Sequence, residues 1–224
     1  MEDLSHRCIK LNGDVKIIKY GKTKDGRQKY KCKHCGCTFL KKYSYNAYLF
    51  SVNTEIVNLL KEGVGIRGIS RLVNISSNTV LSRIVKLSKQ VKKPMISKAK
   101  VYEMDELCTY VRNKDNRIWI AYSIRKDTRE VIDFKVGKRT NKTLRSVVNT
   151  LLLSDAKRIY TDKLKQYRSL LPSKIHKTTQ YGTNHIERMN VNLRTHLKRL
   201  SRKTICYSKS LVMLNACLML YFWG

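Results

Sequence analysis

The order of apolar runs between residues 98 and 224 constrains the fold of this chain most. Three runs rich in β-branched and aromatic residues, typical of strands, come first: 101–107, 118–124 and 131–136. Helical and extended patterns then alternate: a helix at 141–153, a strand ending at Asp162, a helix at 163–171, a strand near Ile175 and a helix from Ile186 to about Leu200. Successive strands followed by this alternation predict an α/β domain with a mixed sheet.

Three acidic residues of this segment stand where elements meet. Asp105 lies in the first expected strand, Asp162 ends the fourth, and Glu187 begins the last helix. Twenty-four residues without another acid separate Asp162 from Glu187, and no acid follows Glu187. Carboxylates placed in this way can converge at one sheet edge, where they would hold two divalent cations about 4 Å apart.

A simpler interpretation of these acids stays open. Asp162 can cap the helix that follows it, and Glu187 can pair with Arg188 or Arg194 on the surface. Each acid alone favours that interpretation, whereas the three together favour a metal site. Two further acids near the same strands, Glu106 and Asp133, are expected outside the constellation.

The charge balance indicates the kind of partner. The 224 residues include 47 Lys and Arg against 16 Asp and Glu, a net charge of +31. Such an excess repels itself in a compact fold unless it meets a polyanion, so DNA or RNA is expected. A lysine-rich but otherwise ordinary protein would not explain so few acids. The N-terminus has no signal-peptide pattern and the apolar run at 211–223 is too short to span a bilayer, which predicts a cytoplasmic protein without membrane contact.

Residues 1–45 contain a cysteine pattern typical of half a zinc ribbon. Cys32 and Cys35 stand two residues apart before a glycine, which lets a tight turn direct both thiolates to one ion. We expect Zn²⁺ on Cys8, Cys32 and Cys35, with a fourth ligand left open among His6, His34 and Cys37. Leu11 stands where a complete ribbon has a cysteine, so a small β-hairpin with reduced cysteines is the alternative.

Residues 46–97 show three short helical patterns. Apolar residues spaced three and four apart are separated by Gly63 and by Asn74, and Ser76 stands where a helix cap is expected. Such a layout is typical of a helix-turn-helix, whose third helix enters the major groove of DNA. The side chains expected to face the bases are Asn78, Thr79, Ser82 and Arg83.

These segments together resemble a known family. The chain resembles the insertion sequence one family of DDE transposases, with a degenerate zinc ribbon, a helix-turn-helix and a ribonuclease-H-like core at residues 98–224. The stretches that carry the resemblance are 21–35, 104–106, 160–162, 185–190, 192–194, 202–204 and 208–210. The spacing between Asp162 and Glu187 is also that of the family.

The resemblance implies a function and a site. It implies that Asp105, Asp162 and Glu187 bind Mg²⁺ or Mn²⁺ for DNA strand cleavage and strand transfer, and that Arg194 contacts the end of the element. Terminal inverted repeats and target DNA would be the partners of a homo-oligomer associated with the nucleoid. His185 is expected to pack the helix rather than contact DNA. A non-catalytic repressor with a vestigial core is the alternative; a basic ribosome-associated protein would explain the charge but not the acids.

Overall fold

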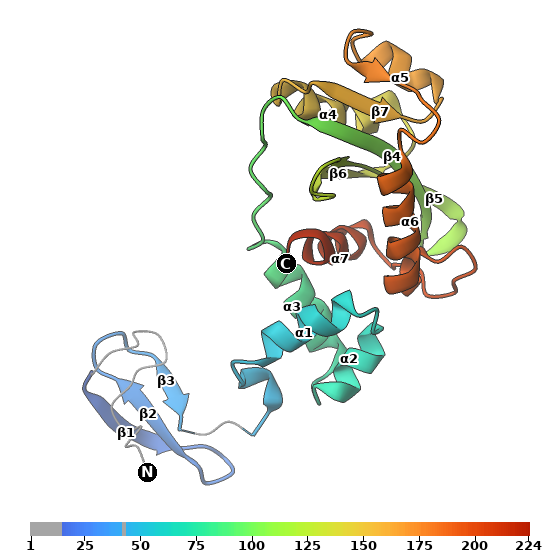
Figure 1. Ribbon diagram of the computed structural model, residues 1–224. Helices are drawn as coiled ribbons and strands as arrows, with labels where there is room; N and C mark the ends of the chain where they lie inside the picture. Colours follow the sequence, from blue (N-terminus) through green and yellow to red (C-terminus); the bar gives the residue numbers. More distant parts are fainter. Residues whose placement is uncertain (1–14, 42–43) are drawn as a thin grey trace. The chain divides into compact units, whose positions relative to one another are not determined.

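The computed structural model describes residues 15–41 and 44–224 (Figure 1). The chain divides into two compact units, residues 1–49 and 50–224. The expected boundary between the helical segment and the core, at residue 97, therefore lies inside the second unit. The predicted zinc ligand Cys8 lies outside the described residues, as do His6 and Leu11.

The first unit contains a three-stranded antiparallel sheet of β1 (Ile17–Lys22), β2 (Gln28–Cys32) and β3 (Thr38–Leu40), followed by the 3-10 helix η2 (Asn46–Tyr48). β1 and β2 form a hairpin, and Gly26 in its turn adopts a φ of 77° that side chains resist. The next turn also uses a glycine with positive φ, Gly36, whose N–H donates to the Cys32 carbonyl.

The second unit begins with three helices, α1 (Val52–Lys61), α2 (Ile66–Leu72) and α3 (Ser77–Ser88). Ile56, Ile69 and Ile84 are fully buried, one from each helix. Ser76 caps α3 by accepting a hydrogen bond from the Thr79 N–H at 3.1 Å, as predicted. Asn74 follows α2 with a φ of 52°, a left-handed conformation that ends the helix.

The core of the second unit is a five-stranded mixed sheet in the order β6-β5-β4-β7-β8. Its strands are β4 (Val101–Val111), β5 (Asn113–Arg125), β6 (Val131–Gly137), β7 (Arg158–Thr161) and β8 (His176–Lys177). The first three are antiparallel, and β7 pairs in parallel with β4 and with β8. This mixed α/β layout fits the ribonuclease-H-like core expected from the sequence.

Helices cover both faces of this sheet (Figure 1). They are α4 (Asn141–Leu153), α5 (Lys165–Leu170), α6 (Asn184–His196), the 3-10 helix η3 (Lys198–Leu200) and α7 (Leu211–Trp223). One apolar cluster joins α4 and α5 to the sheet through Tyr102 and Met104, and another joins α6 and α7 to it through Tyr122 and Phe134. Because strand residues alternate between faces, Glu103 and Asp105 of β4 reach the α6 side.

Two helical features differ from the sequence prediction. The helix expected to continue to about Leu200 ends at His196, because Leu197 has an extended backbone and η3 follows. Leu197 and Leu200 are still buried. The apolar spacing therefore correctly indicated buried positions, but it did not indicate one continuous helix. The C-terminal run forms α7, which the sequence did not predict as a helix because it is apolar on every side.

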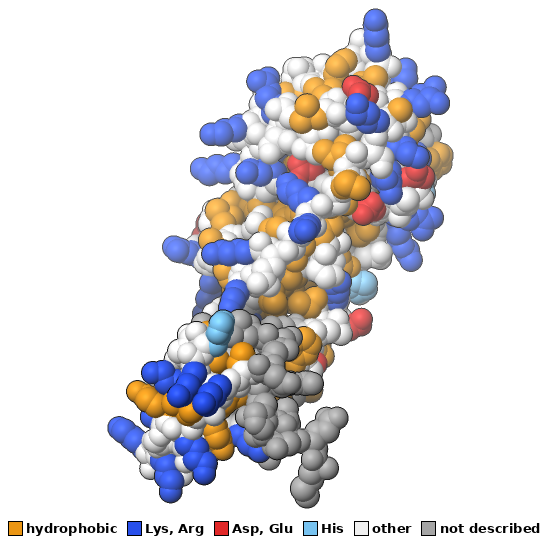
Figure 2. Space-filling model, turned by 90° about the vertical axis from the view of Figure 1, so that its left-hand side faces the viewer, with side chains coloured by type: hydrophobic (Ala, Val, Ile, Leu, Met, Phe, Trp, Pro, Cys, Tyr) orange, Lys and Arg blue, Asp and Glu red, His pale blue; other side chains and the backbone are white. Residues whose placement is uncertain are grey.

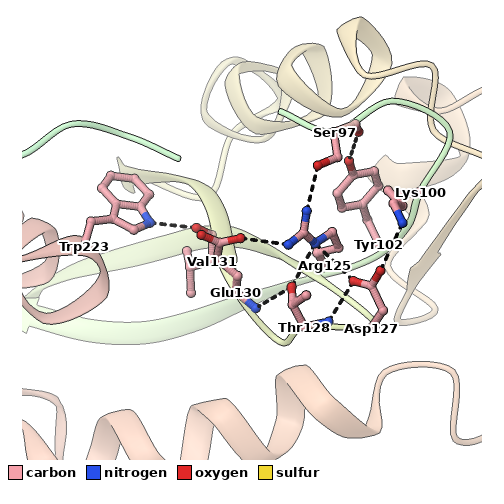
Figure 3. A network of polar contacts seen from close by, with 9 residues as sticks. All are labelled: Ser97, Lys100, Tyr102, Arg125, Asp127, Thr128, Glu130, Val131 and Trp223. Carbon is pink, nitrogen blue, oxygen red and sulfur yellow. Dashed lines mark hydrogen bonds and ion pairs between the residues drawn. The ribbon is translucent and has the colours of Figure 1, made fainter. Parts of the chain in front are cut away.

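Polar contacts attach the ends of the core to its sheet (Figure 3). The linker after α3 is held at Ser97, whose hydroxyl accepts from Arg125 at 2.7 Å and whose carbonyl accepts from the Tyr102 hydroxyl at 2.7 Å. At the C-terminus, the Trp223 indole N–H donates to the Val131 carbonyl at 2.6 Å. No helix in the described part of the chain is long and apolar enough to cross a membrane.

The packing of α7 predicts a large effect of truncation. Leu218 is 0% exposed, so Leu218→Ala should lower the free energy of unfolding by about 2–5 kcal/mol, measured by urea denaturation. Val212 on the same helix is 63% exposed, and Val212→Ala should change it by less than about 0.5 kcal/mol. Equal effects of the two substitutions would contradict the observed orientation of α7.

Candidate active site

Three carboxylates meet where β4 and β7 part. The parallel pairing of these strands ends at Met104 and Thr161, so the residues that follow, Asp105 and Asp162, emerge side by side. One carboxylate oxygen from each of Asp105, Glu106 and Asp162 lies within 4.8 Å of the other two. Several carboxylate oxygens gathered in this way suit a hard divalent cation such as Mg²⁺ or Mn²⁺.

The environment of Asp105 disfavours the charged form of its carboxyl group. Burial first, and the neighbouring charges of Glu106 and Asp162 after it, raise the pKa of its carboxyl group to about 6. Two hydrogen bonds oppose this rise: the Glu106 N–H donates to Oδ1 at 2.7 Å and Asn190 Nδ2 donates to Oδ2 at 2.7 Å. A bound cation would relieve the cost of ionising Asp105.

Glu106 belongs to this cluster, although the sequence placed it outside the constellation. Alternation along β4 directs its side chain toward the α5 face, where Arg139 Nη2 donates to it at 2.9 Å and the Tyr167 hydroxyl donates in a short hydrogen bond. The side chain is only 1% exposed, and its length brings one oxygen within reach of Asp105 and Asp162. Alternation alone could not reveal that reach.

Asp162 lies exposed just after β7. Its Oδ1 accepts from the Leu164 N–H at 3.0 Å, in the turn before α5. The assigned N-cap of α5, Leu164, makes no side-chain cap bond, and Asp162 binds the N–H of Leu164 at the start of this helix. The carboxylate closes the turn and faces the other two acids.

Glu187 stands apart from the three clustered acids. It is exposed in the first turn of α6, and its Oε1 accepts from the Thr183 hydroxyl at 2.8 Å. Within the described residues it forms no ion pair, with Arg188 and Arg194 included. The structure thus brings Asp105 and Asp162 together and leaves Glu187 on the adjacent helix.

Arg194 lies two helical turns beyond Glu187 on α6. It is half-buried, and its Nη1 donates to the Leu200 carbonyl at 2.9 Å. Burial and the neighbouring charge of Arg202 lower the pKa of this guanidinium. Its position leaves part of the side chain open to solvent near the helix face that carries Glu187.

The side chains predicted to meet DNA bases lie on α3. Asn78 and Ser82 are exposed, while Thr79 is half-buried in the capping turn with Ser76. Arg83 donates to Asn53 Oδ1 of α1 at 2.7 Å, so it already has a partner inside the protein.

In the first unit, Cys32 is buried and Cys35 is exposed with its sulfur 3.1 Å from that of Cys37. Zinc binding remains a prediction.

Two polar groups behind the cluster were not identified from the sequence. Glu103 is fully buried and contacts the start of α6, and Asn190 joins Asp105 to the Tyr122 hydroxyl, which lies 2.8 Å from Asn190 Oδ1. Burial, followed by the nearby Asp105 charge, raises the pKa of Tyr122, so its hydroxyl remains a donor. Glu103 and Asp105 stand two residues apart on one strand, and this spacing could have indicated that both side chains lie on the same face of the sheet.

Lys and Arg predominate among the charged side chains on one face of the molecule. Figure 2 shows Lys and Arg side chains spread widely over the face that it presents, with few Asp and Glu among them. Against this background the clustered carboxylates are an exception. They stand inside a chain whose sequence pI is about 10.1.

A family model described as IS1 transposase matches residues 99–222, which include the whole five-stranded sheet and every acid discussed above. The chain belongs to the IS1 transposase family. The insertion element iso-IS1n protein InsB of Shigella dysenteriae is 35% identical over 112 residues, covering 50% of this chain and 86% of that protein. The insertion element IS1 protein InsB of Shigella flexneri is 38% identical over 108 residues, covering 48% and 82%.

A solved structure also shows a weak likeness to the transposase. It is a simian T-cell lymphotropic virus intasome in complex with PP2A regulatory subunit B56 gamma, 18% identical, with 75% of this chain and 67% of that chain covered. The TM-score of 0.41 is too low to support an argument.

The raised pKa of Asp105 predicts that replacing it with a neutral side chain increases the free energy of unfolding, by an amount that depends on pH. Because the folded protein holds this proton up to about pH 6 and the unfolded chain only to about 3.8, stability falls as pH rises between those values. In EDTA at pH 7.5, Asp105→Asn should therefore raise the free energy of unfolding, by about 1–3 kcal/mol. The gain should disappear as the pH is lowered to 4.

The exposed Asp115 provides the control, because Asp115→Asn should leave the unfolding free energy unchanged at both pH values. Thermal and urea denaturation between pH 4 and 8 measure the effect. A loss of stability in Asp105→Asn that is equal at every pH would contradict the assigned electrostatics.

Proposed function

We propose that this transposase cleaves DNA strands at the ends of its element and joins them to target DNA, using a divalent cation held by Asp105, Asp162 and Glu187. The supporting observation is that carboxylate oxygens of Asp105, Glu106 and Asp162 lie within 4.8 Å of one another in a member of the IS1 transposase family, with Glu187 on the helix α6 beside them. Mg²⁺ or Mn²⁺ bound there would supply activation of the attacking oxygen and stabilisation of the leaving one.

The protein's own groups then orient the ligands. Asp105 and Asp162 hold the cation from two neighbouring strands, and Asn190 fixes the Asp105 carboxylate by donating to Oδ2. Glu106 contributes a third oxygen from the other side of β4, kept in place by Arg139 and Tyr167. Glu187 completes the ligand set from α6, where its Oε1 accepts from the Thr183 hydroxyl.

Basic and polar groups would hold the DNA. Arg194, on the same helix as Glu187, contacts the phosphate backbone at the end of the element. In the helical segment, Asn78, Thr79, Ser82 and Arg83 read the terminal inverted repeats as a helix-turn-helix.

The ribbon segment supports this binding with Zn²⁺ on Cys8, Cys32 and Cys35. Bringing two ends together needs at least a dimer of the chain, acting at the nucleoid.

The catalytic assignment predicts that each of Asp105→Ala, Asp162→Ala and Glu187→Ala abolishes cleavage of a labelled inverted-repeat end in Mg²⁺ or Mn²⁺. DNA binding should survive each change and can tighten, because a negative charge near phosphate is lost. Asp115→Ala is the control, as Asp115 is an exposed acid on the same sheet. Asp133 is unsuitable because it is buried and bonded to Lys93 and Thr150.

Substantial cleavage by Glu187→Ala would overturn its assignment as a ligand. An equal loss in Asp115→Ala would show that the assay reports a general effect of charge. A folded wild-type protein that binds its ends but never cuts them would instead favour a non-catalytic regulator of the element.

The recognition assignment predicts that Arg83→Ala weakens binding to the cognate end by about 1–3 kcal/mol and has little effect on random DNA. Because Arg83 donates to Asn53, Asn53→Ala is the matched control for the loss of that internal contact. Mobility-shift titrations at fixed salt measure both. The same loss on both DNAs, or the same loss in Asn53→Ala, would mean that Arg83 does not read bases.

A further inference from the structure

Glu103 is a buried carboxylate that the proposed chemistry does not use. It is 0% exposed, lies two residues before Asp105 on β4, and is not among the three clustered acids. A carboxylate removed from water is stable only if its oxygens are paired. Its partners therefore show what it does.

All of these partners are at or near the start of α6. Its Oε2 accepts from the Ile186 backbone N–H at 2.9 Å and its Oε1 from His185 Nδ1 at 2.7 Å. Lys126 Nζ lies 3.4 Å from Oε1 and also donates to the Gly182 carbonyl at 3.2 Å, just before the helix. Glu103 thus satisfies a free N–H of the first helical turn and also pairs with the Lys126 ammonium group and the His185 ring.

A second contact between β4 and α6 lies two residues further along the strand and four residues further along the helix. Asp105 accepts from Asn190, as Glu103 accepts from Ile186. Two residues of a strand span about 6.7 Å, and four residues of a helix span about 6 Å. The two attachments therefore match in length, and they hold α6 in one register along β4 with Glu187 between them.

The junction before α6 packs closely against β7. A side chain at Gly182 would place its Cβ 2.7 Å from the Tyr160 ring of β7 and 2.7 Å from the Thr179 hydroxyl. The Tyr160 ring is also covered by Lys126, whose Nζ lies 4.2 Å from its centroid. The helix start is thus fixed against both strands that carry the clustered aspartates.

We propose that Glu103 is a positioning residue, which through His185 and the Ile186 N–H sets α6 on β4 and so places Glu187 relative to Asp105 and Asp162. The inference rests on the proposed function, because it concerns the placement of a ligand of the same cation. It also gives His185 a defined role. This histidine packs the helix by a directed hydrogen bond rather than by contact with DNA.

A purely structural ion pair would behave differently. Replacing a buried charged pair by apolar groups is often neutral for stability, and its loss would then leave the chemistry intact in folded protein. Loss of a positioning group shifts the metal dependence of the reaction even when the protein stays folded. Groups of this kind typically change metal affinity or activity about 10–100-fold.

The test uses the full chain and a labelled duplex carrying the terminal inverted repeat, with the cleavage rate measured against Mn²⁺ concentration at saturating DNA. Glu103→Met removes both acceptors and should raise the half-maximal Mn²⁺ concentration about 10–100-fold. Glu103→Gln keeps an oxygen for the Ile186 N–H and an amide for the other tautomer of His185, and should stay close to wild type. DNA binding should be unchanged in both.

Two further variants keep the test decisive. His185 has a side chain that is 34% exposed, so His185→Ala should fold and show a smaller shift in the same direction. Leu218→Ala, a destabilising change in α7, should retain the wild-type Mn²⁺ dependence below its unfolding temperature. All rates are measured well below the unfolding temperature of each variant.

Wild-type Mn²⁺ dependence in Glu103→Met and in His185→Ala, with Asp105→Ala inactive, would overturn the positioning role alone. The same shift in Leu218→Ala would also overturn it, because any loss of stability would then suffice. Cleavage by Asp105→Ala would overturn the proposed function, and the positioning role with it.

Discussion

Repulsion between carboxylates is the constraint on which the core of this protein depends. Asp105, Glu106 and Asp162 place oxygens within 4.8 Å of one another, and burial holds the pKa of Asp105 near 6. Such an arrangement lowers stability unless hydrogen bonds or a cation offset it. The surrounding residues act on this point: Asn190 and the Glu106 N–H donate to Asp105, and Arg139 donates to Glu106.

The parallel pairing of β4 with β7 brings the two aspartates together, and α6 supplies Asn190, which donates a hydrogen bond to Asp105. The strand pairing fixes the distance between the two aspartates, because it ends one residue before each of them. The helix crosses the same face of β4, bonded through Glu103 at its first turn and through Asn190 one turn later. A site assembled from a rigid sheet and one helix can bring a further carboxylate, Glu187, to the aspartates without moving the strands.

Much of this architecture follows from the sequence because it depends on local patterns. The predicted helix at 141–153 coincides with α4, Ser76 caps α3, and Asp105 lies within a strand while Asp162 follows one. The features that the sequence did not predict depend on how far a side chain extends, or lie in a segment whose apolar residues show no helical period. Alternation placed Glu106 opposite Asp105 but could not show that its carboxylate reaches the cluster, and α7, apolar except for Asn215, carried no helical period. The partners of Glu103 required the three-dimensional register of α6.

Direct measurement of cation binding tests the central claim, that the clustered carboxylates form a divalent metal site. Titration of Mn²⁺ into the metal-free full-length protein, followed by electron paramagnetic resonance of the free ion, counts the bound ions without any reaction. We predict saturable binding that Asp162→Asn greatly weakens and that Asp115→Asn leaves unchanged. Equal Mn²⁺ binding by the wild type and by Asp162→Asn would contradict the account.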